Sequence, residues 1–283
     1  MADELGGVTL HCGDALEVLR GLPTGSVDAV VTDPPYPCID RDYGRWTEAE
    51  WFALMDPVVS ECRRVLTPTG SAVFVLQPNS ERVGRMRTWL WRFMADWGER
   101  WGIVQDVWWC NTAVLPSGVS IRGNLARPAT KACVWLGSPD CHRDQAAVLL
   151  PLGDWVNRKG RCYESRKVKT QMPSGQGVAI GRVVDTAVRR GGSTPFNYLL
   201  ITRGGPENRS NQGHPASTPV ELCRWWVRYI CPPGGVVLDP FAGSGTTGVA
   251  ALVEGRKAVL IERHPPYCDI IRKRIRGVTP ALV

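Results

Sequence analysis

The segment from residue 236 to residue 262 constrains the fold of this chain more than any other part of its sequence. Residues 236–238 predict a strand, and the ten residues Asp-Pro-Phe-Ala-Gly-Ser-Gly-Thr-Thr-Gly at 239–248 predict a loop that opens a helix ending near Glu254. Residues 257–261 predict a second strand, and Glu262 follows it directly. This order is typical of a parallel α/β sheet that binds a nucleotide-like ligand at the carboxyl ends of its strands.

The rest of the chain alternates short apolar strands with longer helical stretches. Thr47 and Glu50 form the sequence signature of a capping box at the start of one of these helices. The further predicted strands are 8–11, 27–32, 71–76, 103–109 and 132–136, and the further helices are 14–20, 47–65, 80–97, 218–230 and about 267–275. The expected fold class is therefore α/β with a mainly parallel sheet.

The alternation stops between about residues 138 and 212, where Gly, Pro and Arg replace any sustained period. Residues 118–212 hold fifteen Lys and Arg against six Asp and Glu, a local charge of +9, whereas the remainder carries −2. A dense basic segment indicates a surface that contacts phosphates, and a solvated loop without a partner is the alternative. We predict an insert at 138–212 within a domain formed by 1–137 and 213–283, with its basic centre at Arg158, Lys159, Arg161, Arg166, Lys167 and Lys169.

Composition and sequence features argue against a secreted, a membrane-spanning or a zinc-binding protein. With 283 residues, 43% hydrophobic and 22% charged, the chain resembles a soluble globular protein. Its first residues lack the features of a signal peptide and no apolar run approaches ~18 residues, so a cytoplasmic location is expected. Ten scattered cysteines without a Cys-x-x-Cys pair predict reduced thiols, and Cys141 beside His142 lacks the second pair that a zinc site requires, so no metal is expected.

The glycine loop has more than one interpretation. Residues 243–248 match the dinucleotide pattern G-x-G-x-x-G, and Glu262 lies nineteen residues beyond Gly243, so a nicotinamide or flavin enzyme is one alternative. A turn that serves packing alone is another. Glycines allow the backbone to approach a ligand closely, and an acid at the end of the next strand can accept hydrogen bonds from ribose hydroxyls. The preceding Asp-Pro-Phe at 239–241 argues against a dinucleotide enzyme, because such enzymes usually pass straight from strand to glycine turn.

A second segment, Asp33-Pro34-Pro35-Tyr36, follows the predicted strand at 27–32. Alone it could be a stiff loop, but it lies where ligand sites of open α/β sheets are found. An exocyclic amino nitrogen of a base is a poor nucleophile because its lone pair is conjugated with the ring. Asp33 can supply a carboxylate and Pro34 a carbonyl to draw the amino hydrogens out of the ring plane, and the fixed φ of proline holds both. Tyr36 can stack on the base.

Together and in this order, the two segments resemble those of the β group of amino DNA methyltransferases, which transfer a methyl group from S-adenosylmethionine to an exocyclic nitrogen of adenine or cytosine. The resemblance covers nearly the whole chain except the insert. It implies a Rossmann-like S-adenosylmethionine-dependent methyltransferase fold, circularly permuted, with residues 138–212 as the target-recognition region. The implied partner is double-stranded DNA with the target base flipped out of the helix. The family often dimerises, so a homodimer is allowed, although no heptad supports one.

The same resemblance assigns residues. The catalytic ones are Asp33, Pro34, Pro35 and Tyr36, and the basic residues listed for the insert would contact DNA. The imidazole of His214 could instead be structural, although the segment around it resembles the family's helix-opening segment. The residues implied to bind S-adenosylmethionine are Asp14, Asp33, His214, Ser217, Asp239, Phe241, Gly243, Ser244, Gly245, Thr246 and Glu262.

Two positions depart from the family pattern. The family often has a lysine where Cys110 and Asn111 stand, and an acidic residue near Thr130 and Lys131. These departures concern secondary contacts with the base or DNA.

The first residue of the tetrapeptide bears on the target. An initial Asp accompanies adenine more often and an initial Ser cytosine, so Asp33 favours adenine N6, with cytosine N4 as the alternative. A methyltransferase of RNA or protein nitrogen, whose tetrapeptide usually begins with Asn, and a non-catalytic DNA-binding module are further alternatives.

The tryptophans among the arginines of residues 82–101 also have two interpretations. Aromatic and basic residues interleaved can form a nucleic-acid stacking platform. At helical spacing we favour core contacts covered by arginine side chains.

Overall fold

The computed structural model describes residues 2–40, 44–111, 123–126, 128–152, 186–202 and 218–278. The chain forms two compact units, Met1–Arg143 with Asn197–Val283, and Asp144–Phe196. Within the smaller unit, η1 (Gln145–Val148) precedes a bridge between Leu150 and Ser193, and residues 186–190 are helical. The bounds of the smaller unit differ from the predicted insert at 138–212, whose role in target recognition stays a prediction.

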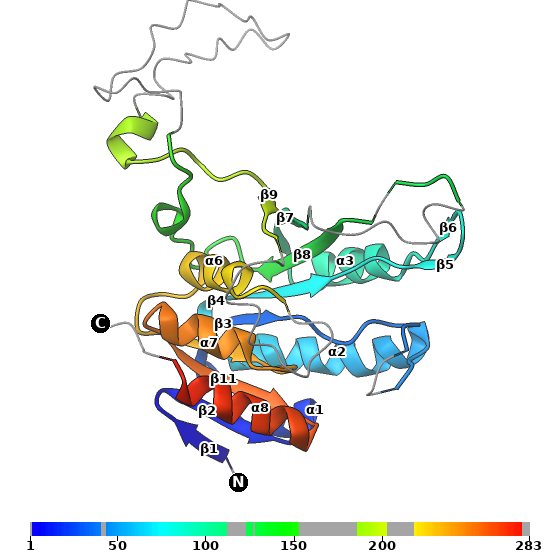
Figure 1. Cartoon of the computed structure of the whole chain (residues 1–283), viewed down its shortest axis with the longest axis horizontal. Coiled ribbons are helices and arrows are strands. Elements are labelled where there is room, and N and C mark those ends of the chain that lie inside the picture. The colour runs from blue at the N-terminus through cyan, green and yellow to red at the C-terminus, as the bar shows by residue number, and fades with distance from the viewer. Residues whose placement is uncertain are drawn as a thin grey trace, which may run out of the picture. The chain divides into compact units, whose positions relative to one another are not determined.

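The larger unit is built on a sheet in which nine described strands lie in the order β1-β2-β11-β10-β3-β4-β8-β7-β9 (Figure 1). The strands from β2 to β4 in this order are parallel throughout, whereas β1 pairs antiparallel with β2 and β8 pairs antiparallel with both neighbours. The prediction of an α/β fold with a mainly parallel sheet is confirmed. The strands are β1 (Ala2–Leu5), β2 (Val8–Cys12), β3 (Val27–Thr32), β4 (Leu66–Leu76), β7 (Ile103–Cys110), β8 (Thr130–Gly137), β9 (Tyr198–Leu200), β10 (Val236–Asp239) and β11 (Lys257–Glu262).

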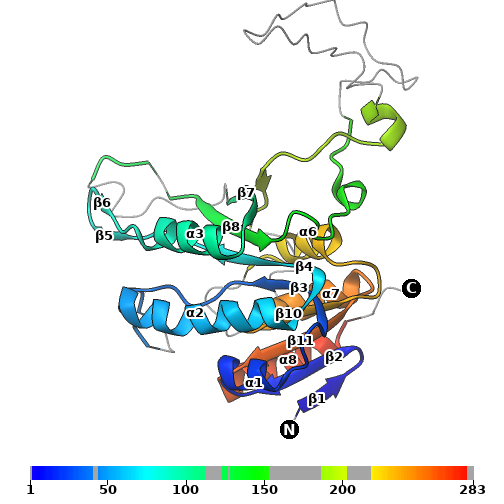
Figure 2. The same ribbon diagram turned by 180° about the vertical axis from the view of Figure 1, so that it is seen from behind.

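Helices cover both faces of this sheet. In Figure 1, α6 (Val220–Ile230), α7 (Thr246–Val253) and α8 (Pro265–Arg276) lie in front of it. Figure 2 shows α1 (Ala15–Gly21), α2 (Glu48–Val65) and α3 (Trp89–Arg100) on the opposite face. The predicted capping box is present, because Thr47 Oγ1 accepts from Glu50 N and Glu50 Oε2 accepts from Thr47 N.

The helix predicted at 80–97 is wrong over its first part. The short strands β5 (Ser80–Arg82) and β6 (Arg85–Met86) form a hairpin there, and α3 begins only at Trp89. Gly84 lies between the two strands with φ +74°, a left-handed conformation that reverses the chain and cannot belong to an α-helix.

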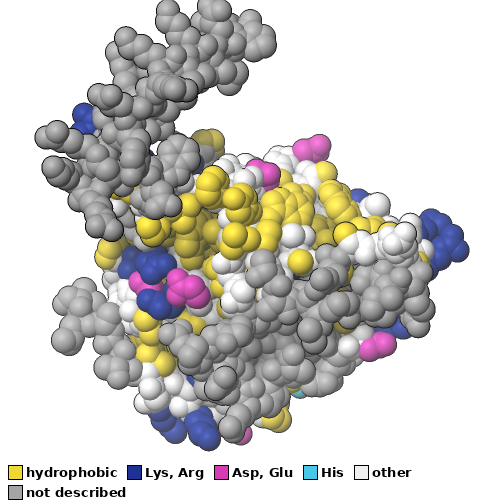
Figure 3. Space-filling model, turned by 45° about the horizontal axis from the view of Figure 1, so that its top comes forward, with side chains coloured by type: hydrophobic (Ala, Val, Ile, Leu, Met, Phe, Trp, Pro, Cys, Tyr) yellow, Lys and Arg dark blue, Asp and Glu magenta, His cyan; other side chains and the backbone are white. Residues whose placement is uncertain are grey.

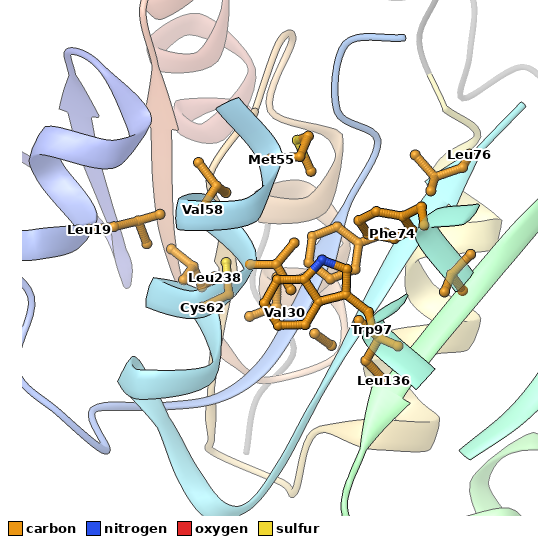
Figure 4. Packing of buried hydrophobic residues seen from close by; sticks show 14 of the residues in the cluster. Leu19, Val30, Met55, Val58, Cys62, Phe74, Leu76, Trp97, Leu136 and Leu238 are labelled. Carbon is orange, nitrogen blue, oxygen red and sulfur yellow. The ribbon is translucent and has the colours of Figure 1, made fainter. Parts of the chain in front are cut away.

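The core between α2, α3 and the sheet is rich in large side chains (Figure 4). Trp51 and Met55 of α2 pack in one cluster with Phe74 of β4 and with Trp89 and Trp97 of α3. Trp89 and Trp97 are buried, and the Arg100 guanidinium lies 3.8 Å from the centroid of the Trp97 ring. The core interpretation is therefore confirmed for these two tryptophans, whereas Trp91 is 45% exposed.

The expectation that all cysteines are reduced thiols is wrong for one pair. A disulfide joins Cys12, the last residue of β2, to Cys268 of α8, with a Cα–Cα distance of 6.3 Å. The two residues are 256 positions apart, so cysteine spacing gives no sign of the pair. Along the described part of the chain, no helix combines the length and apolar character needed to span a membrane.

Candidate active site

Two loops far apart in the sequence meet because β3 and β10 are neighbours. Val237 and Leu238 of β10 pair in parallel register with Ala29 and Val30 of β3, so both strands end at the same edge of the sheet. A cavity of about 290 Å³ opens there. It is lined by eleven of the predicted site residues, namely Asp14, Asp33, Pro34, Pro35, Tyr36, Asp239, Phe241, Gly243, Ser244, Thr246 and Glu262. We call its two parts the glycine-loop end (Gly13, Asp14, Phe241, Gly243, Glu262) and the Asp33 end (Asp33, Pro34, Tyr36, Lys131, Thr218).

At the glycine-loop end, the carboxylate of Glu262 is held by main-chain donors. Its Oε2 accepts from Gly243 N at 2.8 Å and its Oε1 from His264 N at 2.8 Å. The residue is 8% exposed, and this burial raises the pKa of Glu262 while the main-chain N–H groups act in the opposite direction. Among the described residues, the hydrogen bonds to this buried carboxylate come from main-chain N–H groups.

Asp14 lies close to this acid. Gly13 N donates to the Glu262 carbonyl at 2.9 Å, which brings the end of β2 beside the end of β11. The Asp14 side chain caps α1, since its Oδ1 accepts from Leu16 N at 2.9 Å and from Glu17 N at 3.2 Å. Asp14 therefore both caps α1 and lines the cavity.

Gly245 does not line the cavity, unlike its neighbours Ser244 and Thr246. It is the N-cap of α7 with φ +78°, and a Cβ there would lie 3.0 Å from Cγ1 of Ile271 in α8. The positive φ and the packing between the loop and α8 both require a glycine here, and the predicted role of Gly245 in cofactor binding stays a prediction. Ser244 and Thr246 are both buried, and Arg274 Nη1 donates to their hydroxyls at 2.9 Å and 3.3 Å.

Asp239 connects the two ends of the cavity. Its carboxylate is buried and accepts from Thr32 Oγ1 at 2.7 Å and from Phe241 N at 3.1 Å. Burial is the main cause that raises the pKa of Asp239 to about 6. Since Thr32 precedes Asp33 directly, this hydrogen bond ties the glycine loop to the tetrapeptide.

The Asp33 end depends on side chains from several elements. Tyr36 OH donates to Asp33 Oδ1, while Lys131 Nζ and Thr218 Oγ1 donate to Oδ2 at 3.0 Å and 2.5 Å. Lys131 Nζ also donates to Tyr36 OH at 2.7 Å. Sequence reasoning missed Thr218 and treated Lys131 as a departure from a pattern. A signal for Lys131 existed, because a single lysine directly precedes the apolar run 132–136.

The two prolines have different surroundings. The Pro35 carbonyl accepts from Trp51 Nε1 at 2.6 Å, which ties the loop to α2. Pro34 is buried and lines the cavity, and within the described parts of the chain no hydrogen bond engages its carbonyl. An acceptor is therefore available at Pro34 and occupied at Pro35.

Several predicted residues lie outside the described residues. His214, Ser217 and the six basic residues between 158 and 169 all belong to this group. In the described part of the surface that Figure 3 shows, hydrophobic side chains gather in the middle, and Lys and Arg lie mainly toward the rim.

Known proteins resemble this chain over most of its length. A family described as DNA methylase matches residues 27–273. The type II methyltransferase M.PvuII of Proteus hauseri is 27% identical over 281 residues, which cover 92% of this chain and 81% of that protein. The solved structure of the PvuII DNA methyltransferase, described as cytosine-N4-specific, has a TM-score of 0.71 at 21% identity and covers 98% of this chain and 89% of that one. The M1.HpyAVI–SAM complex has a TM-score of 0.59 at 18% identity, with 95% and 98% covered.

Proposed function

The chain belongs to the DNA methylase family that acts on N6 of adenine or N4 of cytosine, and on this premise we propose that it methylates adenine N6 in double-stranded DNA. It is a site-specific, S-adenosylmethionine-dependent DNA methyltransferase. The observation that carries the choice of target is Asp33, an acid at the first position of the tetrapeptide and in the same cavity as the glycine loop.

The residues of the glycine-loop end fit S-adenosylmethionine. Glu262 presents a buried carboxylate that suits the ribose hydroxyls. Gly243 has no side chain, so a ligand can approach the backbone of the loop beside Glu262. Phe241 adds an apolar wall, and Asp14 adds a second acid. When bound, S-adenosylmethionine supplies a methyl group on a positively charged sulfur.

In the proposed reaction, the Asp33 end holds the flipped base. Asp33 and the carbonyl of Pro34, which accepts no hydrogen bond from the described residues, accept the two amino hydrogens, so the nitrogen lone pair turns toward the glycine-loop end. Asp33 Oδ1 is the oxygen with remaining acceptor capacity, since two donors already meet at Oδ2. Tyr36 offers its ring for stacking. The spare proton leaves to Asp33 or to water, and flipping costs a few kcal/mol, which phosphate contacts offset.

Cytosine N4 is the second candidate. The solved PvuII methyltransferase, whose similarity covers 98% of the present chain, is described as cytosine-N4-specific. Both bases present an amino group beside a ring nitrogen that accepts hydrogen bonds. The acceptors of the Asp33 end suit either amino group, so the identity of the base requires a chemical measurement.

We further propose that the basic insert contacts DNA phosphates and contributes target recognition. The support is the local charge of +9 over residues 118–212, which include the insert, in a chain whose remainder carries −2. The predicted homodimer stays a proposal that rests on the family relationship. The mass of the protein in solution tests it.

The decisive experiment incubates unmethylated genomic DNA with labelled S-adenosylmethionine and wild type, Asp33→Ala or Asp140→Ala, an exposed aspartate outside the cavity. Nucleosides are then separated and identified by mass spectrometry. We expect N6-methyladenine from wild type and Asp140→Ala only. If N4-methylcytosine forms instead, the assignment moves to cytosine. If neither product forms although the protein binds S-adenosylmethionine, activity on DNA is refuted.

A further inference from the structure

Lys131 occupies a position where a lysine is costly. It is the second residue of β8 and is only 8% exposed, in a strand where every residue from 131 to 137 is buried. Lysine is rarely buried unless its charge is paired, because removing an ammonium from water costs several kcal/mol. An apolar residue would suit the fold at this position better. The charge of Lys131 therefore points to a role in the cavity that it lines.

Among the described residues, the hydrogen-bond partners of this ammonium belong to the Asp33 end. Lys131 Nζ lies 3.0 Å from Asp33 Oδ2 and 2.7 Å from Tyr36 OH. It also lies 5.1 Å from the centroid of the Tyr36 ring and 5.3 Å from that of Trp109, its cross-strand neighbour in β7. One cation thus contacts both polar side chains of the tetrapeptide.

The distribution of donors on Asp33 is unequal. Lys131 and Thr218 both donate to Oδ2, whereas among the described residues Oδ1 accepts only from Tyr36. A carboxylate oxygen accepts about two hydrogen bonds, so Oδ2 is filled and Oδ1 retains one free position. This arrangement fixes the rotamer of Asp33 and leaves one oxygen for an amino hydrogen.

We propose that Lys131, assisted by Thr218, is a positioning residue that anchors Asp33 Oδ2 and Tyr36 OH, so that Asp33 Oδ1 receives the amino hydrogen of the target base. The inference rests on the proposed function and assigns Lys131 no direct contact with the methyl group. Positioning of this kind acts on the chemical step, because a misplacement of about 1 Å can reduce a rate about 100-fold. Binding at the glycine-loop end does not involve Lys131.

The test compares wild type with Lys131→Met and with Lys257→Met, a matched change at an exposed lysine of β11 outside this cavity. Methylation of genomic DNA gives kcat and the KM for DNA, calorimetry gives the affinity for S-adenosylmethionine, and thermal unfolding reports folding. For Lys131→Met we expect kcat to fall about 100-fold, with cofactor affinity and KM for DNA within about twofold of wild type. Lys257→Met should behave as wild type.

Chemical rescue asks whether the ammonium itself is needed. Lys131→Ala leaves space at the cavity wall, so added n-propylammonium should restore about tenfold or more of the lost kcat, whereas n-propanol should not. Asp33→Ala should gain nothing from either additive. A Lys131→Met protein with kcat within about threefold of wild type would overturn the proposal, as would loss of folding in both Lys131 variants. Because wild type is measured in parallel, a failure of the proposed function is seen separately as a wild type without methylation.

Discussion

The two ends of the cavity are built on different principles. At the glycine-loop end, the acid Glu262 is held by main-chain N–H groups of Gly243 and His264, within one strand-loop-helix-strand unit. At the Asp33 end, the acid is held by the side chains of Tyr36, Lys131 and Thr218, the last two 98 and 185 positions away. Main-chain contacts within one unit depend on local sequence, whereas side-chain contacts between distant elements depend on the assembled fold.

Asp239 joins the two ends, and its ionisation has the largest expected effect. Its pKa in the folded protein is about 6, above the ordinary value of 3.8, because burial disfavours the charge. The folded state therefore binds the proton more tightly than the unfolded state. This contribution to stability is present below about pH 4 and is lost as the pH rises through about 6, a change of about 3 kcal/mol.

The measurement is the free energy of unfolding of wild type and Asp239→Asn in denaturant at several pH values from 4 to 8. We expect the variant to become more stable relative to wild type as the pH rises, because its amide cannot ionise. Other titrating groups are common to both proteins and cancel in the difference. A difference that does not change with pH would mean that burial does not raise the pKa of Asp239 in the folded protein.

Glu262→Gln tests the glycine-loop end alone. The amide keeps an oxygen for one main-chain donor but loses the charge, and hydrogen bonds to charged groups contribute about 2 kcal/mol. We expect the affinity for S-adenosylmethionine to fall about 30-fold by calorimetry, with Glu17→Gln on the exposed face of α1 as the control. Asp33 is also among the residues that the family resemblance implies for cofactor binding, but its carboxylate contacts Tyr36, Lys131 and Thr218, so Asp33→Ala should leave this affinity nearly unchanged. If both changes weakened binding equally, the two ends would not be independent.

These differences explain what the sequence could predict. The strand, loop, helix, strand and acid of residues 236–262 were predictable because their contacts lie within one unit. The Asp33 tetrapeptide was visible as a motif. The roles of its anchors Lys131 and Thr218 were not predicted. The lysine before the apolar run 132–136 was a signal, but its partners come from other elements and meet it only in the folded sheet.

Two other features escaped prediction for related reasons. β9 was not predicted, because three residues that gain their hydrogen bonds from β7 carry no period of their own. The hairpin of β5 and β6 was mistaken for a helix because the apolar residues of the following α3 extended the apparent period.

Gly245→Ala separates a structural glycine from a ligand-contacting one. The substitution forces an alanine into φ +78° and brings its Cβ to 3.0 Å from Ile271. We expect a loss of about 1.5 kcal/mol in the free energy of unfolding, with cofactor affinity of the folded protein within about twofold of wild type. Gly6→Ala is the matched control, because Gly6 shares a positive φ of +57° but has nothing within 4 Å of the added carbon. Cofactor binding that fails at Gly245→Ala would place this residue in the site after all.

The smallest expected effect concerns the support that α2 gives to the Asp33 end. Thr47 caps α2, and Trp51, one turn later, donates to the Pro35 carbonyl. Thr47→Ala should lower the free energy of unfolding by about 1 kcal/mol through the lost cap. The methylation rate should not change, because Trp51 is fully buried and its ring contacts Trp89 and Phe93 independently of the cap. If methylation falls together with stability, the Asp33 end is sensitive to small changes in the helices that support it.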